Sequence, residues 1–107
     1  MAQKKLFELV YDPEINQHLP AIDRKYYSLI RRTIKEQLSY EPEVETRNRK
    51  PLERPSVFGL AWELRFGPNN RFRVFYRVDA INYQVRIFAI GVKIGNRLFI
   101  GGEEFIL

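Results

Sequence analysis

The segment from Arg71 to Val78, RFRVFYRV, alternates three arginines with five apolar or aromatic residues. Successive side chains of a β-strand point to opposite faces, so this spacing predicts that Arg71, Arg73 and Arg77 share one face. The planar guanidinium of arginine binds phosphate oxygens in pairs, but it stays protonated and is a poor proton acceptor. The chemistry that this pattern indicates is therefore phosphate binding and the stabilisation of negative charge.

Basic residues are concentrated in the second half of the chain. Residues 46–97 contain eleven lysines and arginines against three acidic residues, whereas residues 1–45 contain seven against eight. The resulting positive field attracts phosphate backbones or an acidic protein partner. Within this half, Arg47, Arg49 and Lys50 have no aromatic neighbours, which favours contacts with a nucleic-acid backbone over base recognition. A solvated loop stabilised by its prolines explains the same residues without a ligand.

The composition is that of one globular domain spanning residues 1–107, because 45% of the residues are hydrophobic and can form a core. The chain has no cysteine, which excludes disulfides and thiolate chemistry. No cluster of metal ligands and no glycine-rich phosphate loop is evident, so we expect neither a metal nor a cofactor. The only histidine, His18, is more simply explained as a structural residue than as a catalytic one. Without a signal sequence or a long apolar run, we expect a cytoplasmic protein that does not enter a membrane.

The N-terminal half predicts a strand followed by helices. Residues 4–11 alternate as a strand does, and Asp12 can cap a helix that begins at Pro13. Pro20 interrupts this helix, which predicts a short piece and a longer one. In the longer piece, apolar residues recur every four positions at Ile22, Tyr26, Ile30, Ile34 and Leu38. This period indicates an amphipathic helix packed on a sheet, and Pro42 ends it.

A loop over residues 46–61 leads to three antiparallel strands, with turns at GPNN and DAIN. On the first two strands the expected core residues are Trp62, Leu64, Phe66, Phe72, Val74, Tyr76 and Val78. On the third strand we expect the core residues to be Tyr83, Val85, Ile87 and Ala89, with Gln84, Arg86, Phe88 and Ile90 on the other face. That other face also gathers Arg65, Arg71, Arg73 and Arg77. The order of elements predicts an α+β fold with two helices, or one kinked helix, on one face of a mainly antiparallel sheet.

The segments WELRF, RFRVFYRV and VRIFAIGVK, followed by a short C-terminal tail, resemble the RelE/ParE superfamily of toxins from bacterial type II toxin–antitoxin systems. The resemblance covers essentially the whole chain, and it implies the RelE/ParE-like fold and a cognate antitoxin protein as partner. RelE-like members are ribosome-dependent mRNA endonucleases, whereas ParE-like members inhibit DNA gyrase without nuclease chemistry. The RelE-like activity is the favoured expectation, and the ParE-like activity is the alternative.

The resemblance also implies roles for residues of these segments. Arg65 falls where such enzymes carry a basic strand residue, Arg73 falls on their phosphate-binding arginine, and Lys93 stands in place of an arginine. Two positions depart from the RelE pattern, because Glu63 replaces a lysine and Phe99 replaces a tyrosine near the C-terminus. A carboxylate among arginines is held ionised, which makes Glu63 a candidate general base. A salt-bridge partner is the other interpretation of Glu63.

Cleavage of RNA requires removal of a proton from the 2′-hydroxyl, protonation of the leaving oxygen, and stabilisation of charge on the phosphate between them. Arginine suits only the last task, so we expect the ribosome to orient the mRNA. The nuclease hypothesis predicts that Arg65, Arg73 and Lys93 converge on the sheet face away from the helices. The expected RNA contacts beyond them are Arg47, Arg49, Lys50, Arg71, Arg77 and Arg86.

Overall fold

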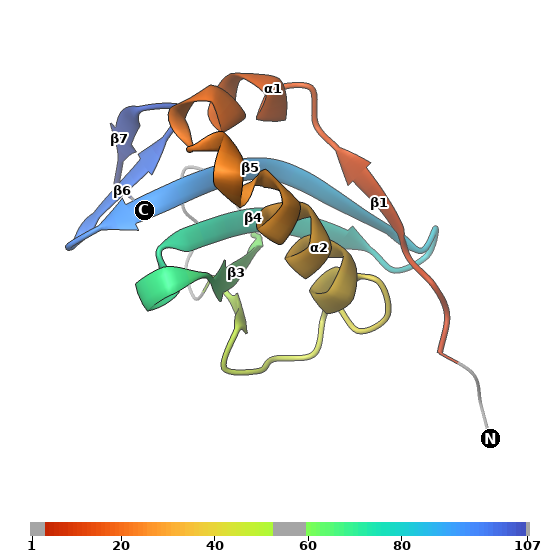
Figure 1. The fold of residues 1–107 in the computed structure, drawn as a ribbon. Helices are drawn as coiled ribbons and strands as arrows, with labels where there is room; N and C mark the ends of the chain where they lie inside the picture. The colour runs from red at the N-terminus through yellow and green to blue at the C-terminus, as the bar shows by residue number, and fades with distance from the viewer. Residues whose placement is uncertain (1–3, 53–59, 107) are drawn as a thin grey trace.

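The computed structural model describes residues 4–52 and 60–106 and shows helices packed on one face of a single sheet (Figure 1). Within these residues the strands are β1 (Glu8–Tyr11), β2 (Arg49–Pro51), β3 (Trp62–Phe66), β4 (Phe72–Asp79), β5 (Gln84–Ile94), β6 (Arg97–Ile100) and β7 (Glu103–Phe105). The helical elements are α1 (Ile15–His18), η1 (Leu19–Ala21), η2 (Arg24–Tyr26), α2 (Tyr27–Leu38) and η3 (Pro68–Asn70). The α+β class predicted from the sequence is confirmed.

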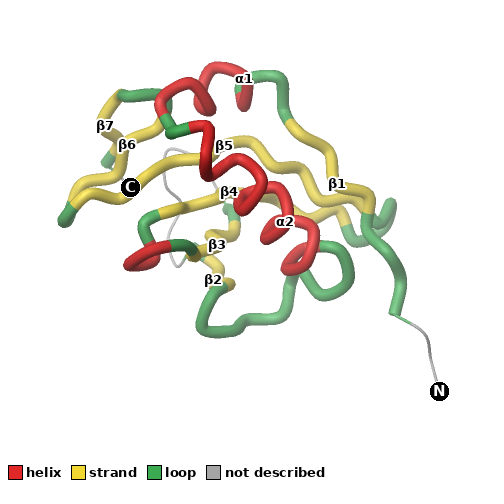
Figure 2. Tube along the Cα trace, in the orientation of Figure 1, coloured by secondary structure: helices red, strands yellow, loops and turns green. Residues whose placement is uncertain are grey.

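The strands form an antiparallel series in the order β2-β3-β4-β5-β6-β7, and β1 joins β5 in parallel. Both β1 and β6 pair with β5 but at different places along it, β1 over Gln84–Ile87 and β6 over Gly91–Ile94. Figure 2 shows β5 as the long strand that connects these two regions. The middle of β5 therefore lies between the end of one neighbouring strand and the start of another.

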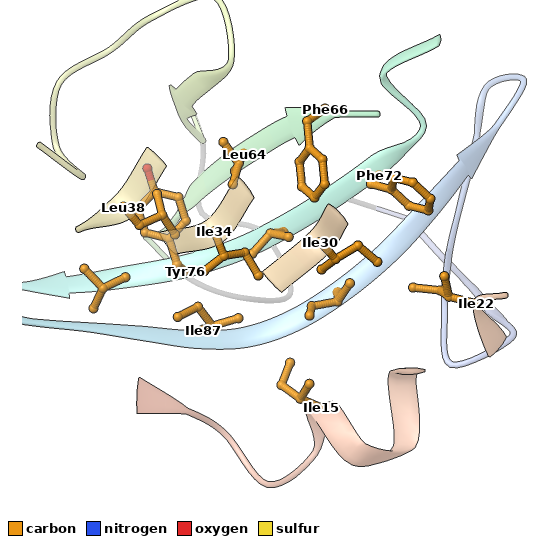
Figure 3. Close-up of a cluster of buried hydrophobic side chains, with 13 residues drawn as sticks. Ile15, Ile22, Ile30, Ile34, Leu38, Leu64, Phe66, Phe72, Tyr76 and Ile87 are labelled. Carbon is orange, nitrogen blue, oxygen red and sulfur yellow. The ribbon is translucent and has the colours of Figure 1, made fainter. Parts of the chain in front are cut away.

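The helical segment is divided into a short and a longer part as predicted, but the break falls at Ile22, whose backbone is extended, because Pro20 is accommodated in the first turn of η1. The carboxylate of Asp12 accepts a hydrogen bond from the backbone N–H of Glu14 at 3.2 Å, and the short helices α1 and η1 follow. The chain then turns through η2 into α2, whose buried face packs on the sheet residues shown in Figure 3. That buried face consists of Ile30, Ile34 and Leu38. In the described part of the chain, no helix combines the length and the apolar character that crossing a membrane requires.

The loop expected over residues 46–61 contains a strand that the sequence did not reveal. Residues 49–51 form β2, which pairs antiparallel with β3 so that Arg49 lies opposite Leu64 and Lys50 lies opposite Glu63. Three residues with a proline among them carry too little alternation to signal a strand. Residues 53–59 of the expected loop lie outside the described residues.

A β-bulge in β5 overturns part of the predicted face assignment. Phe75 pairs with Ala89 and Tyr76 pairs with Ile87, so Phe88 is an extra residue in β5. A bulge of this kind shifts the alternation of side chains by one position. Ile87 and Ile90 consequently belong to the helix-side core, whereas Phe88 and Ala89 lie with Phe75 on the opposite face. The expected faces of Ala89 and Ile90 were wrong for this reason.

The face away from the helices holds a second, smaller apolar cluster as well as the arginines. Its buried members are Ala61, Phe75, Phe88, Ala89, Leu98 and Ile100. Two partly buried residues pack against this cluster: Leu52, which directly follows β2, and Phe105 of β7. The β6–β7 hairpin therefore covers part of the sheet face that the sequence predicted to be simply charged.

Candidate active site

The face of the sheet away from the helices contains a cavity of about 310 Å³, here called the arginine cavity. Arg65 of β3, Arg73 of β4 and Lys93 of β5 line it together with Glu63 of β3. Its remaining lining residues are Leu52, Asn96, Arg97, Leu98, Glu104, Phe105 and Ile106. The structure thus brings together the three basic residues to which the resemblance assigns a role and Glu63, the candidate general base.

Glu63 is the centre of a buried charge network in this cavity. Arg65 Nε donates to Glu63 Oε1 at 2.6 Å, and Arg73 Nη1 donates to Glu63 Oε2 at 3.4 Å. Arg65 and Arg73 lie directly opposite each other in the β3–β4 register, where like charges repel. The carboxylate, whose residue is only 3% exposed, offsets this repulsion and orients both guanidinium groups.

Arg73 is held in place by several contacts. Burial lowers the pKa of its guanidinium, while the neighbouring carboxylate of Glu63 opposes that shift. Its Nε also donates to the backbone carbonyl of Asn70 at 3.0 Å, which ties the side chain to the turn before β4. The donors that remain on the two Nη groups are available to a phosphate at a fixed place in the cavity. Such preorganised charge is the arrangement that stabilises developing negative charge most effectively.

Lys93 reaches the arginine cavity because of the bulge in β5. Regular alternation from Val85 along the strand would place Lys93 on the helix side with Ile87. The extra residue Phe88 reverses the alternation, so Lys93 lies on the same face as Arg73. The strand position is fixed further by a hydrogen bond from the backbone N–H of Lys93 to the carbonyl of Arg71 at 2.7 Å.

Arg77 and Arg86 do not belong to this site. They lie opposite each other in the β4–β5 register, and neither lines the arginine cavity. The guanidinium of Arg77 lies 4.2 Å from the ring centroid of Phe88, a cation–π contact, and Arg86 forms an ion pair with Asp12 at 3.8 Å. Phe75, Phe88 and Ala89 of the smaller apolar cluster lie along β4 and β5 between Arg73 and this arginine pair.

Arg49, one of the expected RNA contacts, is buried and makes its hydrogen bonds within the fold. It is only 8% exposed, its Nε donates to the carbonyl of Val44 at 3.0 Å, and its Nη1 donates to the carbonyl of Gln37 near the end of α2. The bond to Gln37 satisfies a carbonyl that the end of α2 leaves without a partner in the helix. Arg47 and Lys50 are exposed, and Lys50 lies across from Glu63 on the face of the arginine cavity. The two remain candidates for backbone contacts.

Phe99 and His18 lie together on the other side of the sheet. Phe99 pairs with Val92 and lines a cavity of about 210 Å³ that also includes His18. The position at which the resemblance implies a tyrosine is therefore not part of the arginine cavity. The Nδ1 atom of His18 accepts a hydrogen bond from the backbone N–H of Ile90 at 3.3 Å. His18 thus bonds to β5 between the parts of that strand that pair with β1 and with β6, in agreement with the structural interpretation.

Sequence reasoning missed Arg97 and Glu104, which complete the wall of the arginine cavity. Their side chains form an ion pair at 3.6 Å between Nε and Oε2. The signal that could have revealed Arg97 is the dipeptide Gly95-Asn96, which favours a tight turn between two strands. Gly95 has a φ of 61°, as that turn requires.

Comparison with solved structures identifies the fold. A chain of the toxin–antitoxin complex RelBE2 from Mycobacterium tuberculosis matches with a TM-score of 0.69 and 19% sequence identity. The match covers 87% of this chain and 98% of that chain. The chain has a RelE-like fold. No protein-family profile and no curated protein sequence matches it. The fold expected from the strand segments is therefore confirmed by structural likeness.

Proposed function

We propose that this chain is the toxin of a type II toxin–antitoxin system and that it cleaves mRNA on the ribosome. The observation that carries the proposal is the arginine cavity, in which Arg65 and Arg73 bind one buried carboxylate and Lys93 lines the same hollow. The cavity lies on a fold shared with a chain of a toxin–antitoxin complex, which supports the same assignment.

In this proposal the basic residues bind the scissile phosphate. Arg73 is preorganised by Glu63 and Asn70. It stabilises the charge that grows on the phosphate as the 2′-oxygen bonds to phosphorus and the bond to the 5′-oxygen breaks, with the 2′-hydroxyl proton passing to solvent or the ribosome and the leaving 5′-oxygen taking a proton from the same surroundings. Lys93 and Arg65 bring further positive charge to the same cavity. Removing one such donor from an active site typically lowers the rate about a hundredfold to a thousandfold.

Glu63 fits a positioning role better than that of general base. Both of its oxygens are hydrogen-bonded to guanidinium groups, so accepting a proton would break a charge-assisted bond. No histidine or tyrosine lines the arginine cavity among the described residues. The chain therefore contributes binding and charge stabilisation, and the reaction depends on the ribosome to orient the mRNA.

A cognate antitoxin neutralises the toxin in this proposal by covering the basic surface. The repulsion between Arg65 and Arg73 is only partly offset by Glu63, so an acidic segment bound at the arginine cavity stabilises the folded chain. This contact weakens as salt is added.

The test is inducible expression of the chain in bacteria, with growth, protein synthesis and transcript integrity followed in parallel. Lys93→Gln removes a cation of the cavity, and Lys35→Gln removes an exposed lysine from α2 as the matched control. We expect wild type and Lys35→Gln to stop translation with cleaved transcripts, and Lys93→Gln to relieve the arrest while keeping its melting temperature. Arg73→Ala is a poorer test, because the side chain is buried and its loss destabilises the fold.

Two results would count against the proposal. Equal toxicity of Lys93→Gln and Lys35→Gln would show that the arginine cavity is not the site of action. DNA damage with intact transcripts would favour the alternative, in which the chain inhibits DNA gyrase without nuclease chemistry.

A further inference from the structure

A second cavity of about 630 Å³ lies beside the arginine cavity and is here called the hairpin cavity. It lies between the turn that precedes β4 and the hairpin that joins β5 to β6. Its lining residues are Asn69, Arg71, Arg73, Val92, Lys93, Ile94 and Gly95. Arg73 and Lys93 line both cavities, so the two hollows share a wall made of positive charge.

The hairpin cavity carries the less compensated charge of the two. Arg71, Arg73 and Lys93 line it, and none of the described residues lining it is acidic. The arginine cavity, in contrast, is lined by two acidic residues, Glu63 and Glu104, as well as by its cations. An anion that occupies the hairpin cavity therefore meets positive charge without a competing carboxylate in the same wall.

The cations of the hairpin cavity are held by the backbone of the turn. Arg71 Nε donates to the carbonyl of Pro68 at 3.3 Å, and Arg73 Nε donates to the carbonyl of Asn70 at 3.0 Å. The bond from Lys93 N–H to the Arg71 carbonyl, at 2.7 Å, joins the turn to β5. The two guanidinium groups are therefore oriented by the turn, and the backbone of Lys93 is fixed beside them, before a ligand binds, which lowers the entropy lost on binding.

Two apolar residues at the end of β5, Val92 and Ile94, also line this cavity. They alternate with Lys93 and so reach it from the other face of the strand, and Ile94 is 63% exposed. A ligand that contacts both the cations and these apolar residues carries a negative charge next to a flat apolar group, as a nucleotide does. Bases are free to make such contacts in single-stranded RNA, where they are not stacked inside a duplex.

We propose that the hairpin cavity is a second nucleotide subsite for single-stranded RNA. Arg71 and Lys93 bind the phosphate next to the one held at Arg73 in the arginine cavity, and the nucleoside of that unit lies against Val92 and Ile94. The choice of RNA rests on the proposed function. The inference deepens that function, because it gives the chain its own contacts with the RNA strand in addition to those that the ribosome supplies.

The test is equilibrium binding of a fluorescein-labelled single-stranded oligouridylate to the purified full chain, measured by anisotropy at several salt concentrations without ribosomes. Arg71→Gln is compared with Arg32→Gln, which removes an arginine from the exposed face of α2. Ile94→Ser is compared with Ile81→Ser, which changes an isoleucine that is 90% exposed and lines neither cavity. Inorganic phosphate and polyglutamate serve as competitors.

We expect Arg71→Gln to weaken binding about tenfold and to reduce the slope of log K against log salt by about one. Ile94→Ser should lower the affinity for the oligonucleotide several-fold, because it removes the apolar contact. It should leave competition by inorganic phosphate unchanged, because phosphate makes no such contact. The Arg32 and Ile81 controls should bind as wild type.

The inference is overturned if Arg71→Gln binds like Arg32→Gln, or if Ile94→Ser binds like Ile81→Ser. If polyglutamate binds more tightly than RNA and Arg71→Gln abolishes that binding, the cavity is instead a site for an acidic protein segment. Because ribosomes are absent, these results are separate from the growth assay. A chain that binds RNA through Arg71 but leaves transcripts intact would refute the nuclease and keep the subsite.

Discussion

Replacing Glu63 by glutamine tests whether the buried carboxylate holds the arginine cavity together. Arg73 Nη1 lies 3.4 Å from Glu63 Oε2, and both side chains are at least nine-tenths buried. At this distance Coulomb's law with an effective dielectric constant of about 20 gives an attraction of about 5 kcal/mol. Removing one partner of a buried ion pair costs about 3–5 kcal/mol in measured cases.

The lower end of that range applies to Glu63→Gln. Glutamine keeps an amide oxygen that accepts a hydrogen bond, and the Arg65 side chain is 38% exposed, so water screens its interaction. We therefore expect the free energy of unfolding to fall by about 3 kcal/mol, which is a large part of the stability of a domain of this size. Urea denaturation followed by circular dichroism measures this change, and the m-value should stay constant.

Glu36→Gln is the matched control. Glu36 pairs with Arg32 at 4.0 Å on the surface of α2, where both side chains are about two-thirds exposed. That substitution should change stability by less than about 0.5 kcal/mol. A phosphate polymer should stabilise Glu63→Gln more than wild type, because a bound anion supplies the missing negative charge. Equal stability of the two variants, or no extra gain from the polymer, would refute the account of Glu63 as an electrostatic clamp.

Three further substitutions test the surrounding structure. Burial lowers the pKa of His18, so the fold favours the neutral form of this side chain. The free energy of unfolding should therefore fall as the pH falls below about 6.5. The fall should be smaller in His18→Asn, which keeps an acceptor for the N–H of Ile90. Tyr76→Phe removes a buried hydroxyl that donates to the Pro42 carbonyl at 2.7 Å, and urea denaturation should show a loss of about 1 kcal/mol. Gly91→Ala would place a Cβ 2.7 Å from a backbone oxygen of β6, and thermal melting should show a loss of about 2 kcal/mol or more as β5 and β6 separate.

Local patterns predicted the parts of the site that rest on regular elements. The alternation in β3 and β4 places Arg65 and Arg73 on one face, and the structure keeps both strands regular over those residues. The four-residue period of α2 likewise identified Ile30, Ile34 and Leu38 as the face that packs on the sheet. Each of these assignments depends only on neighbours along the chain, and such information is present in the sequence.

Arg49 shows the limit of the same reasoning. Its neighbours Arg47 and Lys50 are basic and exposed, and nothing in the local pattern separates the three. The difference lies in the carbonyls of Gln37 and Val44, which the fold brings to Arg49 across the end of α2. Arg49 is stabilised by carbonyls that only the folded chain brings to it, so composition alone could not distinguish it from its exposed neighbours.

The bulge at Phe88 explains why β5 can serve both faces of the sheet. Before the bulge, Val85 and Ile87 pack under the helices; after it, Ile90 continues that core. The extra residue lets Phe88 and Ala89 both join the opposite cluster, and it turns Lys93 towards Arg73. A strand without the bulge would turn Lys93 to the helix side and take Ile90 out of the main core, and both changes are costly. Packing on the two faces therefore selects the bulge, and the convergence of Lys93 with Arg73 follows from that selection.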